Sequence, residues 1–256
     1  ISAGILLSII ALASSAPYDW RIIEGKLVAH GTYPSIVSLQ YNGRHFCGGT
    51  IVNKNTIVSA AHCFYGRTFY TYTVVAGVSQ LSRKPSTSQT RSTSRVILHP
   101  SYTSQYAYIY GNDIAILKLS SPLNLDADAS IKAQSFPSLG VEPSSPGDKC
   151  FVAGWGSVTP SGSTPSDRLY EAGITVISND DCSKVFARTK DNKTQVCAGG
   201  QTKESACRGD SGGPLYCKSG NGFIQVGVVS YGKVPCGGAP AVFARVSNLR
   251  SFMDKY

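Results

Sequence analysis

A single serine stands among glycines in the segment Cys207–Pro214, which reads CRGDSGGP. Ser211 has Gly209 two positions before it, Gly212 directly after it and Asp210 beside it. Glycine lets the backbone adopt unusual dihedral angles and approach a ligand closely. The oxyanion of an acyl-transfer intermediate needs main-chain N–H groups at short range. The segment therefore suits a nucleophilic serine, although Gly/Ser turns without any chemistry are also common.

A serine becomes a strong nucleophile when a histidine, itself oriented by a carboxylate, accepts its proton. All four histidines precede Ser211, and they are His30, His45, His62 and His99. The α/β-hydrolase order of serine, acid and histidine is excluded, because no histidine follows Ser211. The subtilisin order would need Asp19 as the acid if His62 were the base, and Asp19 lies in a segment that we expect to be removed. The order that remains is histidine, aspartate, serine.

His62 and Asp113 have the sequence surroundings that this order requires. His62 follows the largely apolar run Ile57–Ala61 and precedes Cys63, so we expect it at the end of a buried strand. Asp113 opens the apolar run Ile114–Leu119, where a carboxylate loses water and needs a partner such as an imidazole N–H. Three such sites in the one permitted order indicate a Ser-His-Asp triad.

Several motifs carry a resemblance to a known family: SAAHC at 59–63, NDIA at 112–115, GDSGGP at 209–214, HFCGG at 45–49, GWG at 154–156 and SYG at 230–232. On these motifs the chain resembles the chymotrypsin/trypsin family of serine endopeptidases, from about Ile22 to the C-terminus. The resemblance implies that His62, Asp113 and Ser211 form the catalytic triad. It also implies that the N–H groups of Gly209 and Ser211 form the oxyanion hole.

Short runs rich in valine, isoleucine and aromatic residues alternate with clusters of Gly, Pro, Ser and Asn, which is typical of an all-β chain. The clearest expected strands are 35–40, 73–76, 95–98, 114–119 and 225–229. One helix is expected at Ser247–Met253, with Ser247 as its N-cap. The resemblance implies two packed six-stranded antiparallel β-barrels with a short C-terminal helix. The first barrel would span about 22–123 and the second about 124–256, with the triad in the cleft between them.

The chain has eight cysteines, an even number that is typical of an oxidising compartment. Zinc binding is the alternative use of cysteine, but the chain has no C-x-x-C pair, so neither a metal nor a cofactor is expected. Spacing alone leaves the pairing open. The resemblance implies the pairs Cys47–Cys63, Cys150–Cys217, Cys182–Cys197 and Cys207–Cys236.

The N-terminal residues read as targeting and processing segments. An apolar run followed by ASSA at 13–16 predicts a secretory signal peptide at 1–16, whose true start is expected to lie before Ile1. The apolar run is too short to span a membrane. Residues 17–21 are expected to be a short pro-segment that precedes the protease domain at 22–256. We therefore expect a secreted, extracellular protein.

The resemblance also implies how the chain is activated. Cleavage after Arg21 would free the ammonium group of Ile22, which would pair with Asp210 and shape the oxyanion hole. Before cleavage, Ser38 and His45 match positions that can hold this acid in the inactive form of relatives. The chain is thus expected to be made as a zymogen.

Specificity is expected to depend on Ser205, which lies six residues before the nucleophile and matches the base of the substrate pocket in the family. The other matching pocket positions are Ser230, Gly232 and Ala241. A neutral base predicts a preference for aromatic or large aliphatic P1 residues. The alternative is trypsin-like specificity, with negative charge supplied by Glu204, which we expect to point away from the pocket. Residues that match positions around the outer cleft are Tyr110, Phe186 and Tyr231.

The net charge of +9 has two interpretations. The densest basic stretch, 82–95, could bind polyanions, but it is rich in Ser and Thr and is expected to be a solvated surface loop. It overlaps the calcium-binding loop of some relatives and contains no Asp or Glu, so calcium is not expected. No segment resembles a nucleic-acid module. The sequence NKT at 192–194 is a glycosylation sequon.

The rival class of function is a catalytically inactive relative that acts as a binding protein. Such proteins lose a member of the triad, whereas this chain keeps His62, Asp113 and Ser211. The expected partners are protein or peptide substrates, an activating protease and protein inhibitors. A monomer without nucleic-acid or membrane partners is expected.

Overall fold

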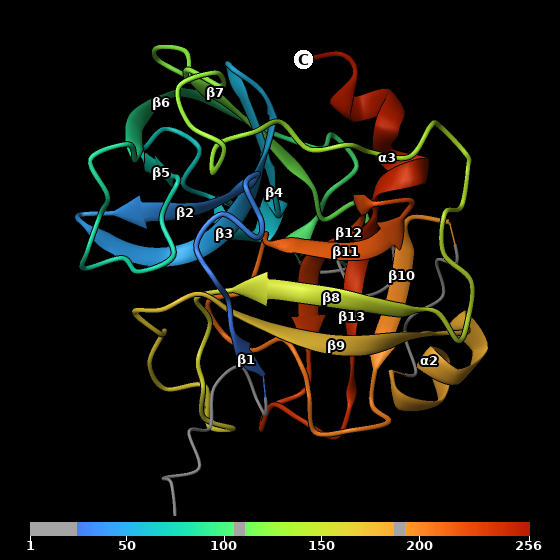
Figure 1. The fold of residues 1–256 in the computed structure, drawn as a ribbon. Helices are drawn as coiled ribbons and strands as arrows, with labels where there is room; N and C mark the ends of the chain where they lie inside the picture. Colours follow the sequence, from blue (N-terminus) through green and yellow to red (C-terminus); the bar gives the residue numbers. More distant parts are fainter. Residues whose placement is uncertain (1–24, 105–110, 187–192) are drawn as a thin grey trace, which may run out of the picture.

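Two closed β-barrels of six antiparallel strands each pack against one another (Figure 1). The computed structural model describes residues 25–104, 111–186 and 193–256. The first barrel, in ring order, consists of β2 (Ile36–Tyr41), β3 (Arg44–Asn53), β4 (Thr56–Ser59), β7 (Ala115–Leu119), β6 (Gln89–Leu98) and β5 (Thr73–Ala76). The second consists of β9 (Tyr170–Ile177), β10 (Gln195–Gly199), β13 (Pro240–Arg245), β12 (Gly222–Gly232), β11 (Pro214–Ser219) and β8 (Lys149–Gly154), which pairs with β9 and closes the ring. The all-β prediction of two six-stranded barrels is confirmed.

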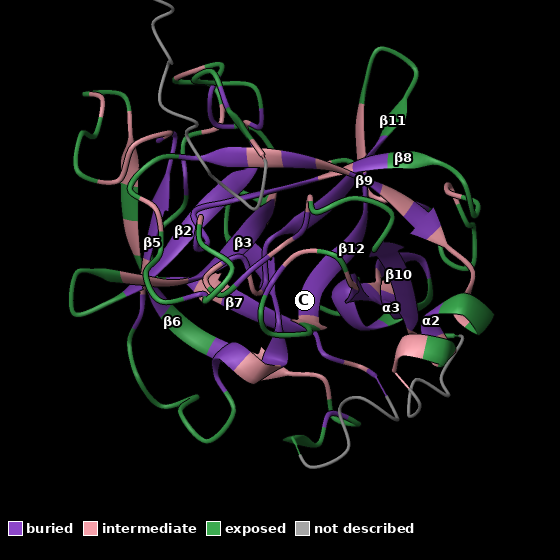
Figure 2. Cartoon of the chain, turned by 90° about the horizontal axis from the view of Figure 1, so that it is seen from below, coloured by how far each residue is buried: buried purple, intermediate pink, exposed green. Residues whose placement is uncertain are grey.

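Strand β9 illustrates how the sequence forms a barrel wall. Its eight residues alternate strictly between buried and half-buried positions, because successive side chains of a strand point to opposite faces. The buried set belongs to the core of the second barrel, and it is Tyr170, Ala172, Ile174 and Val176. The strands are buried over much of their length, and exposed residues gather in the loops (Figure 2).

Strand β6 is longer than the sequence predicted. It begins at Gln89, whereas the apolar pattern indicated a strand only over 95–98 and a loop over 82–95. Its first half is polar and mostly half-buried or exposed, so the sequence there has no apolar pattern that would predict a strand. This half is a strand because its backbone pairs with β5. The basic stretch is therefore divided: Arg83 and Lys84 precede the strand, and Arg91 and Arg95 lie on it.

The two ends of the described chain pack against the barrel that they do not belong to in sequence. Strand β1 (Lys26–Leu27) pairs with β9 of the second barrel, although the predicted first barrel began at 22. Helix α3 (Val246–Met253) lies at the other end of the chain, and its buried residues join the hydrophobic cluster of the first barrel. The His99 and Phe252 rings lie 4.8 Å apart across this contact. The barrels are thus tied by both termini (Figure 1).

The helices differ from the prediction in two details. α3 confirms the C-terminal helix, but it starts one residue early, after Arg245, and no side chain caps it. The Ser247 hydroxyl instead contacts Glu142. Helix α2 (Asn179–Val185) was not predicted, because only one of its seven residues is buried and no apolar periodicity marks it. The hydroxyl of Ser178 caps it by accepting from Asp181 N.

No helix in the described ranges is long and apolar enough to cross a membrane.

Candidate active site

His62 and Asp113 meet because β4 and β7 are neighbours. β4 ends at Ser59 and leads into the 3-10 helix η1 (Ala61–Cys63), which carries His62, while Asp113 lies just before β7. Ser59 pairs with Ala115 across the two strands. The His62 Nδ1 atom lies 2.7 Å from Asp113 Oδ2, and the backbone N–H of His62 donates to Asp113 Oδ1 at 2.8 Å. One carboxylate thereby holds both the ring and the backbone of the histidine.

Asp113 accepts a third hydrogen bond, from a residue of the second barrel. The hydroxyl of Ser230, on β12, donates to Asp113 Oδ2 at 2.5 Å. Burial acts to raise the pKa of Asp113, but the charge and hydrogen bonds of His62, with the Ser230 bond, lower it below its ordinary value. Burial acts to lower the pKa of His62, and the Asp113 carboxylate overcomes this effect and raises it. The pair therefore favours an ionised aspartate beside a basic imidazole.

Ser211 lies in a turn that docks onto the first barrel. The backbone N–H of Gly48, on β3, donates to the Ser211 carbonyl at 2.8 Å, and Gly212 N donates to Val229 O at 2.9 Å. Gly212 has φ of +78°, and a Cβ there would overlap Ser59 Oγ and the Gly48 carbonyl. Only glycine fits this close approach. The turn thus places Ser211 beside the segment that leads to His62.

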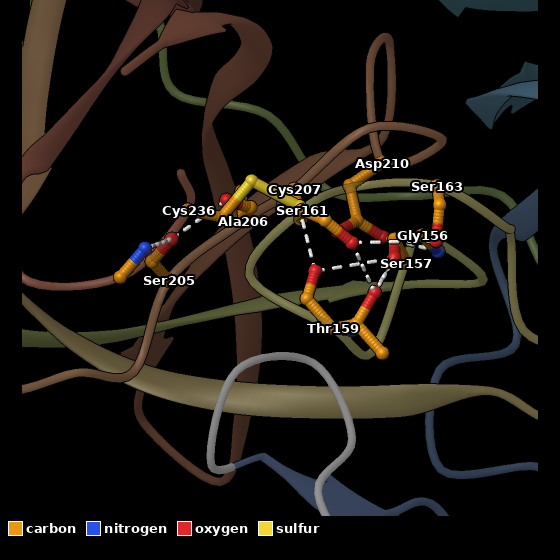
Figure 3. The surroundings of a disulfide bond; sticks show 11 residues. Gly156, Ser157, Thr159, Ser161, Ser163, Ser205, Ala206, Cys207, Asp210 and Cys236 are labelled. Atoms are coloured by element: carbon orange, nitrogen blue, oxygen red, sulfur yellow. Dashed lines mark hydrogen bonds between the residues drawn. A yellow bond between two sulfur atoms is a disulfide. The ribbon is translucent and has the colours of Figure 1, made fainter. Parts of the chain in front are cut away.

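Asp210, directly before Ser211, is fully buried. Its carboxylate accepts from Gly156 N at 2.8 Å and from Cys207 N at 2.9 Å. Figure 3 shows it reaching toward Gly156, where a Cβ would overlap the carboxylate, as it would at Gly154. Burial raises the pKa of Asp210 to about 6, and the two backbone hydrogen bonds oppose this rise. Within the described residues the carboxylate has no cationic partner, although a buried charge requires one.

The backbone around Gly209 is held from the opposite side by His45. The Nε2 atom of His45 donates to the Gly209 carbonyl at 2.9 Å, so Nδ1 of the neutral ring accepts from Ser38 Oγ at 2.9 Å. Burial lowers the pKa of His45 to about 4, which keeps this ring neutral. His45, supported by Ser38, therefore contacts the Gly209 carbonyl. The contact that the resemblance suggested for the inactive form was with the Asp210 carboxylate, and His45 does not make it here.

Gly209 has φ of +99°, a conformation that L side chains rarely adopt. In the described part of the chain, the backbone N–H groups of Gly209 and Ser211 donate to no acceptor. Two free N–H groups beside a serine can stabilise an oxyanion.

A cavity of about 200 Å³ opens beside Ser211. The predicted pocket residues Ser230, Gly232 and Ala241 line it, together with the Cys207–Cys236 disulfide. Ser205 does not line it directly: its hydroxyl donates to Ala206 O at 2.7 Å and accepts from Gly237 N at 3.2 Å. Figure 3 places Ser205 beside Ala206, which does line the cavity.

Glu204 lies elsewhere. Its side chain lines a separate cavity with Lys149 and Glu171, and its Oε2 atom would be 3.8 Å from a Cβ at Gly173 on β9. The described residues that line the cavity beside Ser211 include no acid.

The family model described as Trypsin matches residues 22–253. The chain belongs to the trypsin family. Two similar proteins, both from Mus musculus, are epidermal growth factor-binding protein type B and kallikrein 1-related peptidase b26. Each is 32% identical to this chain, over 96% of it and 94% of the relative.

The cysteines of this trypsin-family chain are joined as the resemblance implied, in the pairs Cys47–Cys63, Cys150–Cys217, Cys182–Cys197 and Cys207–Cys236. The sulfurs of the first pair lie close to the His62 ring, in a group that could hold a metal by distance alone. Disulfide sulfurs are not thiolates, and the thiolate is the form that binds metals. This group therefore offers no metal site while the bridge is intact.

Sequence reasoning missed three contributions to the site. Ser230 was expected only as a pocket residue, but it also holds Asp113. Arg208 and Lys233 line the cavity and were not singled out. Arg208 could have been found from its place beside Cys207, and Lys233 from its place after the SYG motif, whereas no local signal joins Ser230 to Asp113.

Several predictions concern residues outside the described ranges, and these are the signal peptide, the pro-segment, Arg21, Ile22, Tyr110 and Asn192. The other two residues expected in the outer cleft are Phe186 and Tyr231. Their rings pack edge to face, with ring centres 5.5 Å apart.

Proposed function

We propose that this trypsin-family chain is a secreted serine endopeptidase that hydrolyses peptide bonds through an acyl-enzyme. The observation that carries the proposal is the 2.7 Å contact of His62 with Asp113, because Ser230, which donates to the same carboxylate, lines a cavity together with Ser211. The Ser211 hydroxyl attacks the scissile carbonyl, and His62 Nε2 accepts its proton. The N–H groups of Gly209 and Ser211 stabilise the oxyanion. The imidazolium then protonates the leaving amine, and water, activated by His62, hydrolyses the acyl-enzyme.

Activation by cleavage after Arg21 is part of the proposal. A fully buried Asp210 carboxylate that accepts only backbone N–H groups, among the described residues, supports it. The free ammonium of Ile22 supplies the missing positive charge. An ion pair in the interior offsets the cost of burying both charges when its geometry is good. Four disulfides support passage through an oxidising compartment. The proposed partners are protein substrates, an activating protease and protein inhibitors of a monomeric enzyme.

The proposed P1 preference is for aromatic or large aliphatic residues. A Phe, Tyr or Leu side chain gains roughly 1.5–3 kcal/mol when it is buried. A cationic P1 side chain would be buried without a counter-ion at a cost of several kcal/mol, since no described residue lining the cavity is acidic. Glu204, the acid that would favour trypsin-like specificity, lies in a different cavity.

A second candidate function is binding without catalysis. One relative is named for binding a growth factor, at 32% identity to this chain. The three triad residues remain in this chain, which favours catalysis.

Covalent labelling separates the two candidates. We expect the processed protein to react stoichiometrically with an organophosphorus or sulfonyl fluoride reagent at Ser211. Ser211→Ala should abolish labelling and lower turnover on the order of a millionfold while secretion and unfolding stay unchanged. Wild-type protein that folds and is processed but takes up no reagent would identify a binding protein.

Matched peptide anilides test the P1 preference. We expect kcat/KM to be higher for Phe, Tyr or Leu at P1 than for Arg or Lys. Ser205→Asp should weaken this preference, because it introduces a carboxylate next to Ala206, which lines the cavity. A wild-type enzyme that cleaves Arg substrates best would establish the trypsin-like alternative.

A further inference from the structure

Two cationic residues line the cavity beside Ser211. They are Arg208, three residues before the nucleophile, and Lys233, directly after the end of β12. Both are exposed to solvent. In the described part of the chain neither one forms an ion pair with a carboxylate. Both charges are therefore available to a ligand.

Arg208 is held against the loop that precedes β9. A Cβ built on Gly162 would lie 3.0 Å from Arg208 Cδ and 3.1 Å from Cγ, so the aliphatic part of the side chain packs on that loop. The Arg208 carbonyl accepts from Ser157 N at 2.7 Å, which fixes its backbone to the same loop. The guanidinium therefore extends from a supported stem.

Lys233 is held by different neighbours. Its Nζ atom lies 5.9 Å from the centre of the Phe186 ring, within the range of a cation–π contact. Phe186 in turn packs edge to face on Tyr231, which also lines the cavity. This contact positions the ammonium without neutralising its charge. The two cationic residues therefore line the same cavity, and the side chain of each is held by different neighbours.

We propose that this cleft selects peptides that carry an acidic residue within a few positions of the scissile bond, through Arg208 and Lys233. The inference rests on the proposed endopeptidase function and names its substrate class. Clefts lined by one sign of charge concentrate ligands of the opposite sign. The net charge of +9 adds a long-range attraction in the same direction.

Binding to a protein without the nucleophile tests the proposal. The processed Ser211→Ala protein is titrated with fluorescent peptides centred on Phe, with Glu, Gln or Lys at the second position before or after it. Each Glu peptide should bind about 1.5- to fivefold more tightly than its Gln match, the range of an exposed ion pair. The Lys peptides should bind more weakly than the Gln peptides. Rising salt should reduce these ratios.

Charge variants assign the effect to the two side chains. Lys233→Gln and Arg208→Gln should each bring at least one Glu/Gln ratio close to one, and Lys233→Glu should reverse the preference toward a Lys peptide. Lys218→Gln, an equal loss of charge at an exposed site on β11, should leave both ratios unchanged. Equal binding of Glu and Gln peptides, or an effect of Lys218→Gln as large as that of Lys233→Gln, would overturn the proposal.

This experiment is independent of the endopeptidase function, because Ser211→Ala binds without cleaving. Absent labelling of wild-type Ser211 with intact Glu selection would refute catalysis alone. Normal cleavage without Glu selection would refute the charge selection alone.

Discussion

The carboxylate of Asp113 joins groups from both barrels. It accepts from the backbone and ring of His62, in the first barrel, and from Ser230, in the second. Burial acts against its ionised form, but these contacts outweigh burial and lower the pKa of Asp113. Its charge in turn raises the pKa of His62. The basicity of the proposed catalytic histidine therefore depends on one buried residue.

Asp113→Asn should move the acid limb of the pH–rate profile. Activity is lost when His62 becomes protonated, which occurs as pH falls through its raised pKa. Without the carboxylate, burial dominates and lowers that pKa, so the acid limb of the variant should lie at lower pH. The rate on the plateau should fall on the order of 10⁴-fold, because the ring loses its correct tautomer. Asp126→Asn, at an exposed site, is the control; an acid limb that stays in place in Asp113→Asn would contradict this account.

The nucleophile turn depends on its contact with two strands of the first barrel. Gly48 on β3 donates to the Ser211 carbonyl, and Ser59 at the end of β4 donates to the Gly48 carbonyl at 2.8 Å. Gly212 sits against both groups with a positive φ. The position of Ser211 relative to His62 is therefore set by backbone contacts between the barrels.

Gly212→Ala should damage both activity and stability. The added methyl group overlaps Ser59 Oγ and requires a strained backbone, at a cost of about 1–3 kcal/mol. Urea unfolding measures the free energy, and kcat/KM measures the displacement of Ser211. Gly222→Ala, where a Cβ meets open space, should behave like the wild type. Equal behaviour of the two variants would show that the turn does not need this contact.

Processing at the N-terminus connects distant parts of the molecule. Strand β1, which follows the proposed cleavage site, is anchored on β9, and Asp210 is buried near the end of β8 at Gly154. In the folded chain burial raises the pKa of Asp210 from 3.8 to about 6. The folded state therefore binds more protons than the unfolded state between these values, and its stability falls as pH rises through this window.

The uncleaved Arg21→Gln protein should show this loss directly. Its free energy of unfolding should fall by on the order of 3 kcal/mol between about pH 4 and about pH 7, relative to Arg21→Gln/Asp210→Asn, since each pKa unit is worth about 1.4 kcal/mol. In the processed protein the Ile22 ammonium should offset the loss. The uncleaved protein should also be nearly inactive toward peptides. A fully active uncleaved chain, or the same pH dependence in the single and double variants, would exclude this activation mechanism.

The chemistry of the candidate site could be read from the sequence because it depends on residue types and their order. Four histidines that all precede Ser211 exclude the order in which histidine follows serine, and the apolar runs beside His62 and Asp113 mark strand ends. The alternation along β9 is equally local, because a strand has a period of two residues. These features need no knowledge of distant contacts.

Tertiary packing decided what local patterns do not contain. Ser230 reaches Asp113 across 117 positions of sequence, and Glu204 faces a different cavity from the one beside Ser211. The polar half of β6 became a strand because its backbone pairs with β5, and α2 formed around a single buried cysteine. Each terminus also contacts the other barrel: β1 pairs with β9, and the buried residues of α3 join the first hydrophobic cluster. Contacts between residues this far apart depend on how the two barrels close and pack, which residue spacing does not encode.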